Sequence, residues 1–309
     1  MNNFKDPYCY PGTDVLINKL GIKDAEILKE RESALVAVRS LELIDHPIKG
    51  DFDLKHYQAI HKHLFQDVYE WAGKIRDVEI SKSVPELGID SQFWNYANIQ
   101  KEFDKQTQQL NKENHLKNLS PDDFAKRLAH YFGNTNEIHP MREGNGRAQR
   151  EFFSQLANEA NYSIDWNNIS ARAMRLASIE SMYGKTERMQ KMFSANVTDK
   201  EQDKVREILS RQHGEHSIEF AQPNREYTGE IVTQTDRYIV QKVRAVEMAE
   251  NRPKDERFVL HAKEKVIGNA EEKTLLTIKY PAGQIGLVKN PQEIERQTPD
   301  KQRGRDRER

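Results

Sequence analysis

The sequence predicts a mainly α-helical N-terminal domain that contains a short β-hairpin and is followed by a small all-β domain. Apolar residues recur at helical spacing through most of the first part of the chain, whereas from Glu226 onward they recur at every second residue. The chain has 309 residues, which is long enough for two domains. We therefore expect residues 1–198 to form the helical domain, with its core at about 50–195, and residues 199–290 to form the β domain.

The composition argues against several classes of protein. The net charge is -1 and charged residues make up 31%, a balance that favours neither a nucleic-acid binder nor an acidic solvating chain. Cys9 is the single cysteine, so no internal disulfide is expected. There is no apolar run of about eighteen residues, and residues 1–20 lack the basic start and apolar centre of a secretion signal.

The first expected helices follow an ordered segment over residues 1–20. A helix is expected over 24–43, with one apolar face directed at the core: Ile27, Leu28, Leu35, Val38 and Leu41. A second helix over 53–66 carries three histidines whose spacing does not place them on one face: His56, His61 and His63. We expect these histidines to have packing or surface roles, not to form a metal site.

Residues 77–83 alternate in polarity and are followed by a turn signal at 85–88, which predicts a short β-hairpin. A helix is expected over 93–110. Ser120 followed by Pro121 indicates the start of the next helix, which leads to His139. Further helices are expected from Arg147 to about residue 161, over 165–182 and over 186–195.

The loop between two of these helices concentrates the chemistry of the chain. It begins the stretch HPMREGNGRAQR, which runs from His139 to Arg150. Gly144 and Gly146 permit positive φ and a close backbone approach to a ligand. Exposed N–H groups at the start of a helix bind anions such as phosphate. The loop therefore predicts a phosphate site.

The charged residues of this stretch suit the same ligand. Arg147 and Arg150 lie one helical turn apart and are expected to reach one phosphate chain. Glu143 is a natural Mg²⁺ ligand beside a polyphosphate. His139 has an ordinary pKa near neutrality, so it is the candidate general base.

This stretch resembles the signature of the Fic family, His-Pro-Phe-x-(Asp/Glu)-Gly-Asn-Gly-Arg-x-x-Arg. The chain differs at Met141, where the family usually has Phe, and we expect this change to affect packing. The resemblance implies a protein adenylyltransferase, an AMPylase that moves AMP from ATP to a Tyr, Thr or Ser hydroxyl of a target protein with the help of Mg²⁺. A Fic relative that phosphorylates its target has Lys at the place of Gly146, so glycine here favours AMP transfer.

The resemblance also implies roles for single residues. His139 takes the proton from the target hydroxyl, and Glu143 holds Mg²⁺. The implied nucleotide-binding residues are Arg142, Glu143, Gly144, Asn145, Gly146, Arg147, Arg150, Lys82 and Ser83. The hairpin resembles the Fic flap, which pairs with an extended target segment, and three of its residues are expected to dock the target: Val78, Ile80 and Ser81.

The β domain is expected to contain strands within 227–243, 257–262, 273–280 and 284–288, with a turn at 235–236. A Fic domain followed by a small β domain resembles the Bep effectors of Bartonella, whose second module is OB-like. Aromatic residues are too sparse here for a nucleic-acid stacking platform, so a structural or target-docking role is expected. Residues 291–309 read as a disordered charged tail or linker.

Three further expectations depend on the resemblance. Many Fic proteins carry an inhibitory (Ser/Thr)-x-x-x-Glu-(Gly/Asn) helix, and the sequence contains no such motif. We therefore expect a separate antitoxin that supplies a glutamate to Arg150. In the Bartonella effectors a translocation domain follows the OB-like module, so we expect a fragment of a longer protein, made in the bacterial cytoplasm and translocated into a host cell by type IV secretion.

The target is expected to be a host protein such as a small GTPase. Two alternatives stay open within the Fic family, namely an enzyme that uses another nucleotide donor and a catalytically weak scaffold that binds a host partner. An OB protein that binds nucleic acid is a third alternative, and it would show strongly salt-dependent binding to oligonucleotides.

Overall fold

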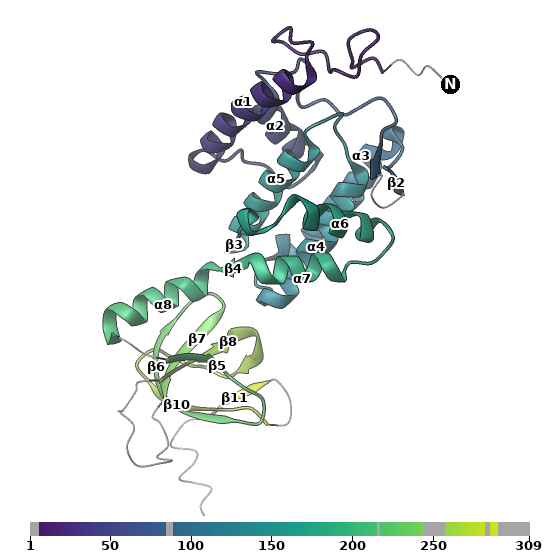
Figure 1. Ribbon diagram of the computed structural model, residues 1–309. Coiled ribbons are helices and arrows are strands. Elements are labelled where there is room, and N and C mark those ends of the chain that lie inside the picture. Colours follow the sequence, from purple (N-terminus) through teal and green to yellow (C-terminus); the bar gives the residue numbers. More distant parts are fainter. Residues whose placement is uncertain (1–5, 85–88, 215–216, 244–256, 282–284, 290–309) are drawn as a thin grey trace, which may run out of the picture. The chain divides into compact units, whose positions relative to one another are not determined.

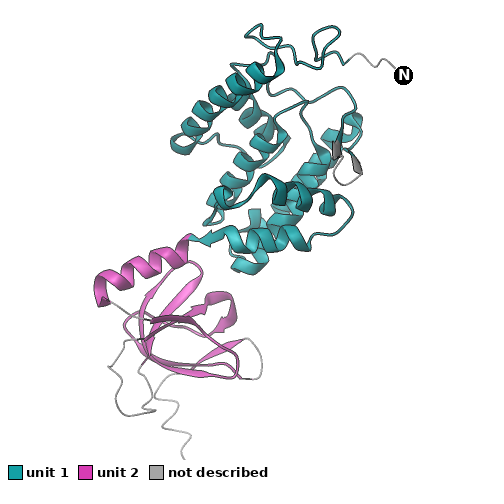
Figure 2. Cartoon of the chain, viewed as in Figure 1, with its two compact units in different colours: residues 1–199 teal, residues 200–309 magenta. Residues whose placement is uncertain are grey.

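The computed structural model describes residues 6–84, 89–214, 217–243, 257–281 and 285–289. It divides into two compact units, residues 1–199 and residues 200–309 (Figures 1 and 2). Unit 1 is helical with a β-hairpin, and unit 2 is built on a β-sheet, so this part of the expected fold class is confirmed. In the described part of the chain, no helix is both long and apolar enough to cross a bilayer.

Unit 1 contains seven α-helices and two short pairs of strands among its described residues. The helices are α1 (Ala25–Asp45), α2 (Leu54–Phe65), α3 (Ile99–Lys112), α4 (Pro121–Ile138), α5 (Asn145–Glu159), α6 (Ala171–Met182) and α7 (Glu187–Asn196). The hairpin pairs β1 (Ser81–Val84) with β2 (Ile89–Gln92), and β3 (Tyr162–Ile164) pairs with β4 (Val197–Asp199). Helices α4 and α5 pack together at the centre, with α2 against α5 and α7 against α4.

The ends of α4 and α5 follow from local sequence. Ser120 caps α4, since its Oγ accepts from the N–H of Asp123 at 3.2 Å, and Pro121 occupies the first turn. At the other end, His139 adopts a left-handed conformation with φ 47°, which stops α4. Gly144 has φ 81° and precedes the first residue of α5. The loop between α4 and α5 therefore has a left-handed residue at each end, His139 and Gly144.

The inward face of α1 differs from the sequence prediction. Leu28 is buried and Leu35 is half-buried, but Ile27, Val38 and Leu41 are 51%, 56% and 64% exposed. The buried face instead includes Glu32, which lies one turn after Leu28 and is 7% exposed. A prediction from apolar residues alone puts glutamates on the exposed face of a helix. It was therefore wrong for part of α1.

The hairpin region also differs in its boundaries. Strand β1 begins at Ser81, not at residue 77, and the predicted turn at 85–88 lies outside the described residues. The expected helix over 93–110 begins only at Ile99. Asn95 accepts from the N–H of Ala97 at 2.9 Å and starts a short 3₁₀ helix before α3.

Unit 2 consists of α8 (Lys200–His213) and a seven-stranded sheet. The strands are β5 (Ser217–Phe220), β6 (Glu226–Gln234), β7 (Tyr238–Val243), β8 (Arg257–Ala262), β9 (Val266–Ile267), β10 (Leu275–Lys279) and β11 (Gly286–Lys289), in the spatial order β5-β8-β7-β6-β10-β11-β9. Strands β6, β7, β8, β10 and β11 lie where strands were expected, whereas α8, β5 and β9 were not predicted. The OB-like identity of this unit stays a prediction.

Candidate active site

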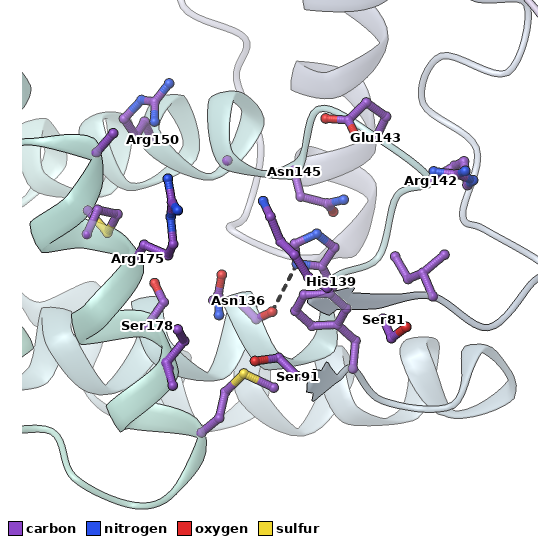
Figure 3. Close-up of a pocket in the computed structure, with 18 of the residues that line it drawn as sticks. Ser81, Ser91, Asn136, His139, Arg142, Glu143, Asn145, Arg150, Arg175 and Ser178 are labelled. Atoms are coloured by element: carbon purple, nitrogen blue, oxygen red, sulfur yellow. Dashed lines mark hydrogen bonds between the residues drawn. The ribbon is translucent and has the colours of Figure 1, made fainter. Parts of the chain in front are cut away.

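A cavity of about 860 Å³ opens in unit 1, where His139 meets the hairpin and α6 (Figure 3). Its walls come from the N-terminal segment, β1, the residues around β2, the end of α4, the loop, the start of α5 and α6. The sequence brings these parts together because α4 and α5 share one core and the loop lies between them. Arg175 and Ser178 on α6 form one side of the cavity, and Arg142 and Glu143 lie on the other.

The His139 imidazole is held in one orientation. Its Nδ1 lies 3.1 Å from the carbonyl oxygen of Asn136, and because a carbonyl only accepts, Nδ1 carries the proton. The Phe93 ring stacks on the imidazole with centroids 3.7 Å apart. Burial lowers the pKa of His139 to about 3, which keeps the ring neutral near pH 7. Nε2 therefore has a lone pair available to accept a proton.

Asn145 shapes the loop through both ends of its side-chain amide. Its Oδ1 accepts from the N–H of Met141 at 2.9 Å, and its Nδ2 donates to the carbonyl of Met141 at 2.7 Å. The Tyr57 hydroxyl donates to the Asn145 carbonyl at 3.0 Å. Asn145 lines the cavity, but these bonds engage its amide within the loop. Met141 is fully buried, as expected for a packing residue.

Gly144 is required by its surroundings as well as by its φ of 81°. A Cβ at this position would lie 2.3 Å from the Phe65 ring. Gly144 does not line the cavity, whereas Gly146 does, and a Cβ on Gly146 would meet only the Arg150 guanidinium, at 4.0 Å. Gly144 thus brings the loop against α2, and Gly146 leaves space beside the first turn of α5.

Two of the three histidines on α2 are packing residues. His61 accepts from the N–H of Gly73 at Nδ1 and donates from Nε2 to the Glu143 carbonyl, each at 2.9 Å. Burial lowers the pKa of His61 to about 4. His56 is 4% exposed and lies 2.8 Å from the Ile48 carbonyl. His61 on α2 therefore holds the loop backbone in place at Glu143.

Glu143 and Arg150 present opposite charges to the cavity. Glu143 is exposed, and its Oε1 accepts from the N–H of Gly144 at 2.9 Å. Arg150 lies four residues after Gly146 on the same face of α5, and no ion pair joins its guanidinium to another described residue. An exposed carboxylate such as that of Glu143 suits Mg²⁺ bound together with phosphate oxygens, so the residues fit that ion. Groups of three or more metal-ligating side chains are absent from the described residues.

Arg147 does not line the cavity, and the expectation that it holds the outer phosphates stays a prediction. Its Nη2 lies 2.5 Å from Oε1 of Glu32 on α1 and 3.8 Å from Oε1 of Glu143, and its guanidinium covers the Phe65 ring. The Tyr69 hydroxyl donates to the other oxygen of Glu32. The buried Glu32 carboxylate and the Phe65 ring therefore hold the Arg147 side chain on the side of α5 that faces α1.

Arg142 lines the cavity and is paired with a residue that the sequence did not point to. Its Nε donates to Oδ2 of Asp6 at 3.0 Å, and Asp6 lines the cavity too. The pair keeps the pKa of Asp6 below its ordinary value, against the opposing effect of burial. The two residues are far apart in the sequence, so no local pattern could have found the contact.

Arg76 is a second residue that sequence reasoning missed. Its side chain is fully buried, and it donates to four backbone carbonyls: His139 at 2.9 Å, Val78 at 2.7 Å, Ile138 at 3.4 Å and Trp94. The N–H of Arg76 also donates to the Pro140 carbonyl at 2.9 Å. Arg76 therefore connects the loop that carries His139 to both sides of the hairpin.

The remaining predicted residues divide between the cavity and its surroundings. Ile80, Ser81 and Lys82 line the cavity. Val78 does not, and it is tied to Arg76 through its carbonyl. Ser83 lies in β1, but its side chain is outside what the structure describes. Six residues of α6, none of them predicted as a site residue, line the cavity, and their spacing places them on one helical face: Ala171, Met174, Arg175, Ser178, Ile179 and Met182.

Comparison with known proteins places this site in a family. The family model described as Fic/DOC matches residues 51–157. A probable protein adenylyltransferase Fic from Salmonella typhimurium is 35% identical over 196 residues, which are 63% of this chain and 94% of that protein. The chain belongs to the Fic/DOC family. The site described above is therefore the site of a Fic domain.

Two other relatives extend the comparison. The protein adenylyltransferase VbhT from Bartonella schoenbuchensis is 47% identical over 194 residues, which cover 63% of this chain but only 39% of VbhT. The crystal structure of the BepC effector from Bartonella tribocorum, with AMPPNP bound, is 33% identical and matches with a TM-score of 0.56 over 62% of this chain and 96% of that chain. The named relatives of this Fic domain are thus protein adenylyltransferases and Bartonella effectors.

Proposed function

We propose that the chain is a protein adenylyltransferase that transfers AMP from ATP to a Tyr, Thr or Ser hydroxyl of a target protein. The observation that carries the proposal is the neutral His139, whose Nε2 lone pair is free because Nδ1 donates to Asn136 in a cavity that also holds Arg150 and Glu143. The names of the relatives and the AMPPNP in the BepC structure support ATP as the donor.

In this proposal the chain's own residues bind the phosphates and move one proton. The first turn of α5 offers N–H groups without intrahelical partners, and Arg150 supplies the positive charge one turn later. His139 accepts the target hydroxyl proton at Nε2 as the oxygen attacks the α-phosphorus and pyrophosphate leaves. A positioned base of this kind contributes about 10²–10⁴-fold. When bound, Mg²⁺ held by Glu143 would offset the charge of the phosphates.

The hairpin is the proposed docking site for the target. Ile80, Ser81 and Lys82 line the cavity at the start of β1, so a target strand placed along the hairpin would present its hydroxyl near His139. Main-chain hydrogen bonds would align such a segment without reading its sequence. We propose a host protein, such as a small GTPase, as the target, reached by type IV secretion as in the Bep effectors.

A test of the reaction type uses ATP labelled at different phosphates. The chain is incubated with host-cell lysate and Mg²⁺, with either α-labelled or γ-labelled ATP. We expect label on a protein from α-labelled ATP only, and none with His139→Ala. Label from γ-labelled ATP would indicate phosphoryl transfer instead. Label with GTP, UTP or CTP but not with ATP would support another nucleotide donor.

We also propose that a separate antitoxin inhibits the enzyme by placing a glutamate on Arg150. The sequence lacks an inhibitory motif of its own, and the Arg150 guanidinium faces the cavity without an ion pair to any described residue. Arg150→Ala should weaken binding of a co-encoded partner and remove its inhibition. If binding and inhibition were unchanged in Arg150→Ala, this part of the proposal would fail.

A further inference from the structure

The Arg147 guanidinium lies between two carboxylates in different surroundings. Its Nη2 is 2.5 Å from Oε1 of Glu32 and 3.8 Å from Oε1 of Glu143. The Glu32 side chain is 10% exposed, whereas the Glu143 side chain is 50% exposed and lines the cavity (Figure 3). Arg147 therefore has one near and buried partner, and one more distant partner that faces the cavity.

The geometry favours the buried carboxylate in this competition for the guanidinium. Opposite charges attract more strongly when their separation and the local dielectric constant are smaller, and both are smaller at Glu32 than at Glu143. The Tyr69 hydroxyl donates to the other oxygen of Glu32, and Tyr69 is buried, so both oxygens of this carboxylate are held. Glu32 thus holds Arg147 at a distance from Glu143.

Without the charge of Glu32, Glu143 would be the carboxylate nearest to Arg147. The two residues are four apart in the sequence. Arg147 would have to move only about 1 Å to reach the usual distance of a charge-assisted hydrogen bond. An arginine often binds a carboxylate through two parallel hydrogen bonds, which engage both carboxylate oxygens. Such a pair would occupy the oxygens of Glu143 that face the cavity.

The Glu143 carboxylate keeps one oxygen available in the observed arrangement. Its Oε1 accepts from the N–H of Gly144 at 2.9 Å, and its Oε2 has no hydrogen bond or ion pair to a described residue. Mg²⁺ binds one or two carboxylates together with phosphate oxygens. A carboxylate that is already paired with a guanidinium is a weaker ligand, because the metal ion must first displace the guanidinium.

We propose that Glu32 is a positioning residue that keeps Arg147 away from Glu143 and thereby leaves Glu143 available to a divalent cation. The inference rests on the proposed function, in which Glu143 holds Mg²⁺ beside the phosphates of ATP. It extends the site to α1, whose described residues 25–45 do not themselves line the cavity.

Calorimetric titration of the full chain with AMPPNP, once with Mg²⁺ and once with EDTA, tests the proposal. The factor by which Mg²⁺ lowers the dissociation constant, called the magnesium gain below, reports on the metal ion separately from catalysis. Glu32→Gln keeps the size of the side chain and removes its charge. We expect the magnesium gain to fall roughly 5-fold, the usual effect of a charge-assisted contact, while the dissociation constant in EDTA stays within a few fold.

Removal of Arg147 distinguishes positioning from a general structural defect. If the loss arises because Arg147 moves onto Glu143, the double variant Glu32→Gln with Arg147→Met should regain the original magnesium gain. Arg147→Met alone should show a gain at or above the original. Glu42→Gln is the matched control, because Glu42 lies on the same helix and pairs with Arg39 at 3.0 Å, and it should leave the gain unchanged. Far-UV circular dichroism checks that each variant is folded.

The proposal is overturned if Glu32→Gln keeps the original magnesium gain, or if the double variant shows the same loss as Glu32→Gln alone. It is also overturned if Arg147→Met alone loses the gain, because Arg147 would then assist the bound nucleotide itself.

Glu143→Gln separates this inference from the proposed function. A lost magnesium gain in Glu143→Gln together with an unchanged gain in Glu32→Gln would refute the role of Glu32 alone. An unchanged gain in Glu143→Gln would refute the metal-binding role of Glu143, and the role of Glu32 would fail with it.

Discussion

At the scale of single residues, the state of His139 follows from its two neighbours. The Asn136 carbonyl fixes the proton on Nδ1, and the Phe93 ring covers one face of the imidazole. A backbone carbonyl cannot change its hydrogen-bonding role, so Nε2 is committed to accepting a proton. In many enzymes a carboxylate orients the catalytic histidine and stabilises its charged form. Here the partner is the neutral Asn136 carbonyl, which stabilises a protonated His139 less than a carboxylate would.

The pH dependence of the transfer reaction should reveal this arrangement. The pKa of His139 is lowered to about 3, so the neutral base persists as the pH falls from 8 to 5. A histidine with its ordinary pKa near 6.5 would instead lose activity about tenfold per pH unit in the lower part of this range. We expect kcat to change little between pH 8 and pH 5 when measured as AMP transfer under saturating ATP. A decline with an apparent pKa of about 6.5 would contradict the lowered pKa.

The two arginines of the signature are expected to differ in function. Arg150 lines the cavity, whereas Arg147 is held by Glu32. Arg150→Met should weaken ATP binding at least ~10-fold through loss of a charge-assisted contact to phosphate. Arg147→Met should leave ATP affinity within a few fold of the original, but it should lower the free energy of unfolding by roughly 3 kcal/mol because the buried Glu32 carboxylate loses its cationic partner. Calorimetric ATP binding and urea unfolding of both variants provide the comparison, and similar losses of affinity would contradict it.

At the scale of secondary-structure elements, Arg76 couples α4 to the hairpin. Its guanidinium binds carbonyls on both sides of the hairpin and at the end of α4, and it lies 3.8 Å from an exposed carboxylate of Glu79. A buried guanidinium that bonds mainly to carbonyls is a planar connector between backbone segments. It is a positioning residue, since it touches neither the cavity nor the proposed substrates.

Arg76→Lys should separate positioning from binding. Lysine keeps the charge but cannot reach several carbonyls in one plane, so we expect kcat for AMP transfer to fall at least ~10-fold through misplacement of His139 and the hairpin. The KM for ATP should stay within a few fold, because the phosphate residues are unchanged. Steady-state kinetics measures both values, and far-UV circular dichroism checks folding. A rise in KM with unchanged kcat would contradict the positioning role.

The sequence predicted those elements that local chemistry determines. The Ser120 cap, the His139–Arg150 loop and the alternating strand β6 each depend on residues close together in the chain. Contacts between residues far apart in the sequence were not predictable in this way. Glu32 is buried because Arg147 and Tyr69 compensate it, and no hydrophobic pattern can indicate a buried carboxylate.

The same limit applies to the candidate site. The signature named His139, Glu143 and Arg150, which line the cavity, but it gave Arg147 an equal place beside Arg150. Arg76 bonds to backbone carbonyls, and such acceptors occur at every residue, so nothing in the sequence marks the contact. The lining residues of α6 do share one helical face, and that periodicity was the one signal available for them.

At the scale of the whole molecule, the two units have separate cores with different chemistry. The core of unit 2 includes a buried polar group in which His261 lies 2.9 Å from the Tyr280 hydroxyl and 3.1 Å from Oε1 of Gln241. Gln241 donates in turn to the carbonyls of Gly229 and Leu276, at 3.1 Å and 2.9 Å. His261 and Gln241 are fully buried, so this network crosses the centre of the sheet.

Unit 2 should lose stability in mild acid for this reason. Burial lowers the pKa of His261 to about 4, so the folded state resists protonation that the unfolded chain accepts near pH 6.5. The stability that His261 contributes is complete above pH 6.5 and is lost as the pH falls to about 4, a difference of about 3 kcal/mol. Urea unfolding, followed by hydrogen exchange in β7 and β8, measures this loss of stability. In His261→Gln the decrease in the free energy of unfolding between pH 7 and pH 4 should be smaller by that amount. An unchanged decrease would contradict the assignment of this pH dependence to His261.

Intact-protein mass spectrometry after incubation with Mg²⁺-ATP and host-cell lysate tests the central claim most directly. The claim is that His139 serves as the base for transfer of AMP to a protein hydroxyl. We predict that the chain itself or a lysate protein gains the mass of one AMP, and that the gain disappears in His139→Ala while ATP binding is retained. An equal gain with His139→Ala, or a gain of phosphate in place of AMP, would contradict the claim.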